Sequence, residues 1–253
     1  MTKKDTPRKL SSPRAAGDIP KIRDSGGEKT LLVNSDHLDV CMKAYYDLRL
    51  DGIALESYSG YTRKDTDFLK EHPGIERIAI IGSSIDPSGI RYLDHLRDLL
   101  ITTSRHPLDL RPCVTLTRYS GDWHPKLLLP APARTALERL RLWGYAPVSR
   151  NLETLGPYHN LKELLLVQSN LESLSGISGF GKISRLELNR LSKLRDISDL
   201  RNLRVEKLIL DGCRKIEGWD IIPKLKGLER LAPRNCGEPE SISQLSERLA
   251  NNP

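Results

Sequence analysis

The feature that most constrains this chain is an apolar pattern that recurs every 21 to 24 residues over much of its length. Each copy has an apolar residue, two variable residues, a second apolar residue, one variable residue and a third mostly apolar position. Successive copies in the second half of the chain begin at Leu137, Leu161, Ile183, Val205 and Leu228. Two further copies begin upstream, at Ile75 and Leu96. A period kept over so many copies indicates a chain built from stacked structural repeats.

The last part of each copy alternates apolar and variable residues, so it predicts a short β-strand with its apolar side chains on one face. One strand cannot bury that face alone. Parallel stacking of one strand per copy creates a continuous core, in which each copy mainly contacts its neighbours. The segments that return the chain, such as 171–180 and 194–200, are short and place apolar residues three apart. This spacing favours 3₁₀ turns over long helices.

The period and the apolar spacing resemble the leucine-rich repeat, in the short 22-residue class seen in internalins and in a protein phosphatase regulatory subunit of that fold. The resemblance covers residues 137–236 and extends to 75–236. It implies an α/β fold, namely a solenoid with a parallel β-sheet on its concave face and short 3₁₀ or irregular return arcs. It implies no single function, because many unrelated activities share this scaffold.

The chain departs from that family at the turn after each strand. The family usually has an asparagine there, which hydrogen-bonds the backbone. This chain instead has Tyr145, Ser169, Leu191, Cys213 and Cys236 at the equivalent positions. Cysteine is a known substitute in this column, so we interpret Cys213 and Cys236 as inward-facing core residues of adjacent repeats, with a redox pair as the alternative.

The N-terminal part of the chain lacks the regular pattern. Residues 1–30 are rich in Lys, Pro, Gly, Ser and Asp and bury too little apolar surface to fold, so we expect a disordered basic tail. Residues 31–74 are expected to form an N-terminal cap or a degenerate first repeat. Within them the pattern predicts a strand and a turn over 47–53 and a short helix over 65–72.

The repeats are expected to fill residues 75–236 as one solenoid. The period breaks at 102–136, where several prolines predict an irregular insertion. Residues 237–253 are expected to form a C-terminal capping helix and a tail, with Ser241 or Ser243 placed before the apolar pattern of that helix.

The net charge of +7 is unevenly placed, because residues 1–30 contain eight Lys and Arg against four Asp and Glu. A basic tail is either a solvated extension or an electrostatic arm for nucleic acid or an acidic partner. The chain has no long apolar run, no secretory signal pattern and no closely spaced cysteines. We therefore expect a cytoplasmic protein with free thiols.

Motifs that carry chemistry are missing from the sequence. The six histidines are scattered, and no phosphate-binding loop or nucleophile elbow occurs. We interpret Asp122 and His124 as a structural or solvated pair, and Cys113 as a buried core residue. A catalytic domain joined to the repeats, as in a ubiquitin ligase, is disfavoured because only about 17 residues follow the last repeat. We expect no enzyme activity, no cofactor and no metal site.

The residues beside each inward leucine should face the concave side, and there they form a candidate binding surface. We expect Trp143, Leu165 and Val167 to cluster, with Leu100 across the irregular gap and basic residues around them. The predicted partner-binding residues are Leu100, Arg139, Arg141, Trp143, Leu165, Val167, Arg185, Lys207 and Ile209. An exposed apolar patch with a charged rim is typical of a protein interface, unless the insertion or the tail covers it.

These features favour a non-enzymatic scaffold that binds a protein partner with an acidic rim through its concave sheet. A bacterial immunity or effector-neutralising protein is one alternative, and nucleic-acid binding through the basic tail is another. Nucleic acid is the weaker candidate, because the concave columns alternate basic with acidic residues and offer only Trp143 for base stacking.

Overall fold

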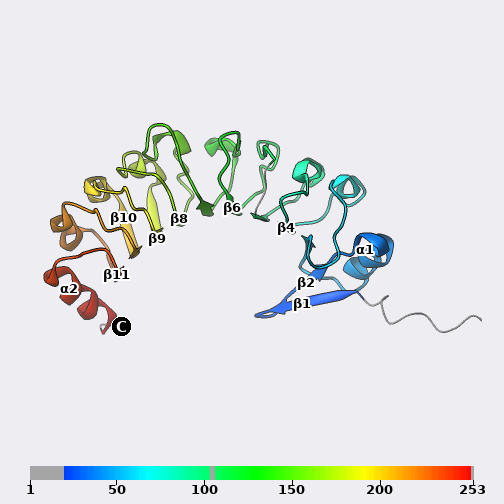
Figure 1. Ribbon diagram of the computed structural model, residues 1–253, viewed down its shortest axis with the longest axis horizontal. Helices are drawn as coiled ribbons and strands as arrows, with labels where there is room; N and C mark the ends of the chain where they lie inside the picture. The colour runs from blue at the N-terminus through cyan, green and yellow to red at the C-terminus, as the bar shows by residue number, and fades with distance from the viewer. Residues whose placement is uncertain (1–19, 103–105, 252–253) are drawn as a thin grey trace, which may run out of the picture.

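The computed structural model describes residues 20–102 and 106–251. Its eleven strands form one sheet, in which they lie in the order of the chain. The sheet forms the inner face of an arch, and short turns form its outer face (Figure 1). The strands are β1 Lys21–Ser25, β2 Glu28–Leu32, β3 Gly52–Glu56, β4 Arg77–Ile81, β5 Asp98–Thr102, β6 Arg118–Asp122, β7 Arg139–Trp143, β8 Glu163–Val167, β9 Lys182–Asn189, β10 Arg204–Asp211 and β11 Arg230–Arg234.

Regular α-helix is confined to the two ends of the arch, with α1 at Leu38–Asp47 and α2 at Glu240–Ala250 (Figure 1). The outer turns are 3₁₀ helices at Ser35–His37, Asp67–Glu71, Pro87–Tyr92, Pro132–Arg134, Glu153–Leu155, Ile177–Phe180, Ser198–Asn202 and Trp219–Lys224. The expected short helix at 65–72 is therefore present as a 3₁₀ helix. No helix within the described ranges is long and apolar enough to cross a membrane.

All neighbouring strands from β2 to β11 pair in parallel, and the pairing joins equivalent positions of successive copies. Leu140 pairs with Leu164, which is followed by Leu186 on β9. This architecture of parallel strands and short 3₁₀ turns agrees with the predicted α/β class, and it is compatible with a repeat solenoid.

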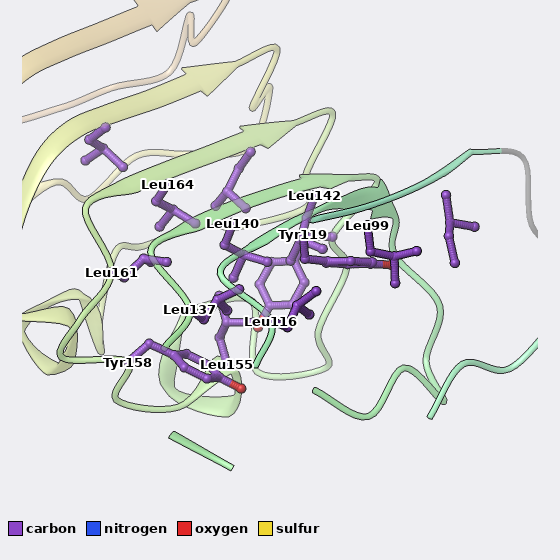
Figure 2. Packing of buried hydrophobic residues seen from close by; sticks show 14 of the residues in the cluster. Leu99, Leu116, Tyr119, Leu137, Leu140, Leu142, Leu155, Tyr158, Leu161 and Leu164 are labelled. Atoms are coloured by element: carbon purple, nitrogen blue, oxygen red, sulfur yellow. The ribbon is translucent and has the colours of Figure 1, made fainter. Parts of the chain in front are cut away.

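The apolar side chains of the strands and of the outer turns meet between the two faces of the arch. Leu140, Leu164 and Leu186 are at most 1% exposed, and Phe180 of the outer 3₁₀ helix Ile177–Phe180 is fully buried against the layer. The sticks in Figure 2 show neighbouring coils contributing to one continuous layer. Full burial of each such side chain contributes about 1.5–3 kcal/mol, so this layer sets the register of the strands.

The chain turns out of its strands through a left-handed residue. Gly144, Gln168, Arg190, Gly212 and Asn235, which directly follow β7 to β11, all have positive φ. The backbone N–H groups of the first four extend the ladder, as where Gly144 donates to Val167 at 2.8 Å. Glycine adopts this conformation without steric cost, whereas a larger side chain is strained there.

At three of its five positions, the turn column that lacks asparagine holds a small side chain that bonds to the backbone, namely Ser169, Cys213 and Cys236. Ser169 Oγ donates to the carbonyl of Tyr145 at 2.5 Å, and Cys213 Sγ to that of Leu188 at 3.4 Å. The backbone N–H of Cys213 lies 3.4 Å from Cys236 Sγ. Both cysteines are buried and free, in agreement with their interpretation as inward-facing core residues.

The prediction of an irregular insertion at 102–136 is wrong for its central part. β6 lies between β5 and β7 and pairs with both in register. Tyr119 occupies the inward position that leucine holds elsewhere and is 1% exposed (Figure 2). The copy has the usual spacing, but Leu116 is followed by Tyr119 and Gly121 where two aliphatic residues are expected. Residues 103–105 lie outside the described part of the chain.

The N-terminal predictions need two corrections. Residues 20–30 are not a disordered tail, because β1 and β2 form an antiparallel hairpin around Gly26 and Gly27, both with positive φ. The predicted strand from 47 is also displaced, because α1 ends at Asp47 and β3 begins only at Gly52. Residues 1–19 lie outside the described residues, so the expected tail is untested there.

The structure has a helix, α2, near the C-terminus; it begins after Pro239, and its N-terminus is not capped by Ser241 or Ser243. Its Ile242 is buried, and Ser246 Oγ donates to the carbonyl of Leu231 on β11 at 2.7 Å. Pro233 lies within β11 and has no N–H to offer a further strand. Helix and proline together protect the last edge of the sheet.

An ion pair between Arg23 and the buried carboxylate of Glu56 fixes the N-terminal hairpin to the sheet. Glu56 on β3 is fully buried and accepts hydrogen bonds from both guanidinium nitrogens of Arg23 on β1, at 2.7 and 3.0 Å. Ser59 Oγ donates a third bond to the same carboxylate. The hydrogen bonds from Arg23 hold the pKa of Glu56 below its ordinary value.

The place of β6 in the core can be tested with Tyr119→Ala. Removing this buried ring should destabilise the fold by about 3 kcal/mol, because a cavity opens between β5 and β7. Ser120→Ala on the opposite face of the same strand should change stability by less than about 0.5 kcal/mol. Urea unfolding measures both, and equal small effects of the two substitutions would show that β6 is not part of the core.

The ion pair predicts a pH dependence. Because folding lowers the pKa of Glu56, its contribution is present above the ordinary value of 4.5 and is lost as the pH falls below it. Glu56→Gln should cost about 2 kcal/mol near neutral pH and progressively less in acid. The control is Asp47→Asn, which breaks an exposed pair with Lys43. A Glu56→Gln deficit that stays constant from neutral to acid pH, in urea unfolding, would contradict this account.

Candidate interaction surface

The register of the sheet brings three of the predicted apolar residues together on its inner face. Trp143 on β7 pairs with Val167 on β8, and Leu165 lies two residues before Val167 on the same face. All three are partly buried and retain solvent exposure. We call these three residues the Trp143 patch. They come from two neighbouring strands of a rigid sheet, so their positions are fixed before any partner binds.

The two other predicted apolar residues lie apart from the Trp143 patch. Leu100 on β5 is separated from Arg141 on β7 by Ser120 of β6. Ile209 on β10 is separated from Leu165 by Glu187 of β9. Adjacent strands lie about 4.8 Å apart, so neither residue extends the patch without a polar gap. The apolar surface is therefore smaller than the sequence predicts.

Three of the four predicted cations are already paired within the face. Arg139 and Arg141 both approach Glu163, with nitrogen–oxygen distances of 3.2 and 3.7 Å. Arg185 contacts Glu187 at 2.7 Å. Lys207 is exposed, and no carboxylate of the described residues lies within ion-pairing distance of it. The rim of the Trp143 patch is thus a network of compensated charges.

Glu187 shows how tightly this network is coupled. Burial alone would raise the pKa of this carboxyl group, but hydrogen bonds from Asn189 and Arg185 outweigh burial and keep the pKa below its ordinary value. Arg141 adds a further favourable charge. Glu187 therefore stays ionised, and a partner must displace or share these contacts to bind at β9.

The same pairing continues toward the N-terminal end of the face. Arg118 on β6 contacts Asp98 on β5 at 3.1 Å, and Arg77 on β4 lies between Asp98 and Glu28. Arg118 belongs to the first concave column, which is formed by the residue directly before the second apolar residue of each copy, as Arg139 is before Leu140. The insertion predicted at 102–136 left Arg118 out of that column. The spacing from Leu116 to Tyr119 is the signal that identifies it.

The residues considered for catalysis have structural surroundings. Burial raises the pKa of the Cys113 thiol to about 11, so it stays protonated near neutral pH. The backbone N–H of Lys126 donates to His124 Nδ1 at 3.0 Å within a turn. In the described ranges, no three His, Cys, Asp or Glu side chains are grouped as a metal site would need.

A groove on the part of the arch after β6 and β7 has a volume of about 490 Å³ and is mainly apolar. Trp123 and Tyr145 form its aromatic wall, with ring centroids 5.7 Å apart and planes at 90°. The hydroxyl of Tyr158 donates to the carbonyl of Pro130 and is not available to a ligand. This groove lies outside the predicted concave columns.

Comparisons with protein-family models, with curated proteins and with solved structures found no match to this chain. The geometry, charge and exposure of the chain's own residues therefore carry the inference of a function.

The predicted basic arm divides into two parts. Lys21, Arg23 and Lys29 lie in the β1–β2 hairpin, where Arg23 is engaged by Glu56. The other cations of the arm lie before residue 20, outside the described residues. The part of the arm that the structure describes thus contributes to folding.

Proposed function

We propose that this chain is a leucine-rich-repeat solenoid that acts in the cytoplasm as a non-enzymatic scaffold and binds a protein partner through its inner face. The observation that carries the proposal is the Trp143 patch, a partly exposed aromatic and aliphatic cluster surrounded by charges on a sheet whose inward-facing leucines are buried. Surfaces of this composition are typical of protein interfaces.

The position of the patch supports the proposal. Trp143, Leu165 and Val167 lie near the middle of the face, so a partner that docks there also reaches strands on both sides. Tryptophan buries a large area with few rotatable bonds and is enriched among residues that dominate binding energy. A curved sheet with a central anchor and polar surroundings favours an extended, shape-matched contact.

The charge pattern favours a protein over nucleic acid at this patch. The cations nearest to it, Arg139 and Arg141, already share Glu163. A phosphate backbone would have to compete with that carboxylate and would be repelled by it. A protein surface can instead supply acidic and basic groups that extend the existing network.

The proposal is tested first by capture. Full-length chain is immobilised and exposed to extract from its native host, alongside Leu165→Glu and Val148→Glu variants. Leu165→Glu places a charge in the patch, whereas Val148 is fully exposed on a turn outside the inner face. A partner should be captured by wild type and by Val148→Glu and lost with Leu165→Glu. Equal capture by all three chains would contradict an inner-face site.

The central anchor is tested by titrating the captured partner against Trp143→Ala. Loss of a buried tryptophan contact should weaken binding by about 2 kcal/mol or more, with no change in the fold by circular dichroism. Val114→Ala, an exposed apolar residue outside the patch, serves as the matched control. Unchanged affinity of Trp143→Ala would remove Trp143 from the interface.

A further inference from the structure

The charge of the described chain is concentrated in its last turns. Residues 31–181 contain 17 Lys and Arg against 18 Asp and Glu, a net charge of −1. Residues 182–236 contain 14 Lys and Arg against eight Asp and Glu, a net charge of +6. The basic excess outside the first 30 residues thus belongs to the part of the arch built from β9, β10 and β11.

On the inner face, ion pairs between the cations of the first column and carboxylates end at β9, where the basic excess begins. The cations of the first column from β4 to β9, including Arg118 and Arg139, each contact a carboxylate. The next two members of that column, Lys207 and Arg230, are exposed, and among the described residues no carboxylate lies within ion-pairing distance of either. Glu206, beside Lys207, is already paired with Lys182 at 2.6 Å.

The first column also places like charges in direct register. Lys207 pairs with Arg185 on one side and with Arg230 on the other, so three cations stand on neighbouring strands. Like charges directly opposite each other in a sheet destabilise it. Only Arg185 is relieved by its own carboxylate, Glu187. A sequence that keeps such a cost without a direct ion pair marks a candidate functional surface.

Further cations continue this surface over the turns that follow the strands. Arg190, Lys193, Arg214 and Lys215 are exposed on the turns after β9 and β10, without an ion-pairing partner in the described chain. Arg190 has a φ of 58°, at a position where β7 and β10 are followed by glycine. Gln168 and Asn235 have the same conformation after β8 and β11, so this turn position accepts a polar side chain as well as glycine.

We propose that this C-terminal basic surface, made of Lys207, Arg230, Arg234, Arg190, Lys193, Arg214 and Lys215, binds an acidic segment of a protein partner. The inference rests on the proposed function and assigns a chemistry and a place to part of the partner. The acidic segment lies across β10 and β11 and the turns beside them, while the rest of the partner contacts the Trp143 patch.

The surface suits a peptide better than a nucleic acid. Ile209 and Ala232 are partly exposed between its two rows of charges and offer apolar contact to a neighbouring side chain. Asp211 on the same face interrupts the path that a phosphate backbone would follow. The only aromatic residue of 182–236 is Trp219, which is 9% exposed and thus leaves no ring for base stacking.

The experiment measures binding of the full-length chain to a fluorescein-labelled peptide of alternating Glu and Ala, by anisotropy at low and physiological ionic strength. Oligothymidylate of equal charge and phosphatidylserine vesicles are the competing probes. The peptide should bind, more weakly as salt rises, and Lys207→Glu/Arg230→Glu should reduce its affinity about tenfold or more. Arg63→Glu/Lys64→Glu makes the same change of net charge at two exposed cations near the other end of the arch and should reduce the affinity about twofold or less.

Arg214→Gln/Lys215→Gln provides a second test on exposed turns, where folding is not at risk. This variant should lower the affinity for the peptide by about threefold or more. The inference is overturned if wild type does not bind the peptide, if both charge reversals weaken it equally, or if oligothymidylate or vesicles bind more tightly than the peptide. Peptide binding without any effect of Trp143→Ala on the captured partner would contradict the Trp143 patch alone. Weaker binding of the captured partner by Trp143→Ala, without any binding of the acidic peptide, would contradict the C-terminal basic surface alone.

Discussion

The structure depends on one repeated contact, the packing of an inward strand residue against its equivalents in the coils before and after it. Leu140, Leu164 and Leu186 are effectively inaccessible to water and lie in direct register. A shift of one residue would expose such a row and bury the charged residues beside it. The apolar layer thus fixes the sheet and, through it, every residue of the inner face.

Because of this packing, the repeat pattern of the sequence determines which residues lie together on the inner face. Because neighbouring strands pair in register, residues about 22 positions apart become neighbours, as Glu163 and Arg185 do. From β4 to β9 the face uses this proximity to compensate its charges around the Trp143 patch. At β10 and β11 compensation ends, and Lys207 and Arg230 stand side by side. One scaffold thereby presents an apolar anchor and a separate cationic surface.

The sequence predicts the parallel strands and the 3₁₀ turns because leucine spacing alone determines both. It misses β6, since Tyr119 and Gly121 fill the same inward positions with residues of different size. It also misses the β1–β2 hairpin, whose stability comes from the distant partner Glu56 and not from local apolar content. The columns of the face were predictable, whereas the pairing of Arg139 with Glu163 was not, because ion pairs depend on side-chain conformation as well as register.

The central claim is that the inner face of β7 to β11 holds a protein partner. Hydrogen–deuterium exchange of the full chain, alone and with its captured partner, tests this claim most directly. The account predicts that binding slows exchange in residues 139–143, 163–167 and 204–211 and leaves the outer 3₁₀ turns unchanged. Protection confined to the outer turns, or to the N-terminal strands β1 to β4, would contradict it.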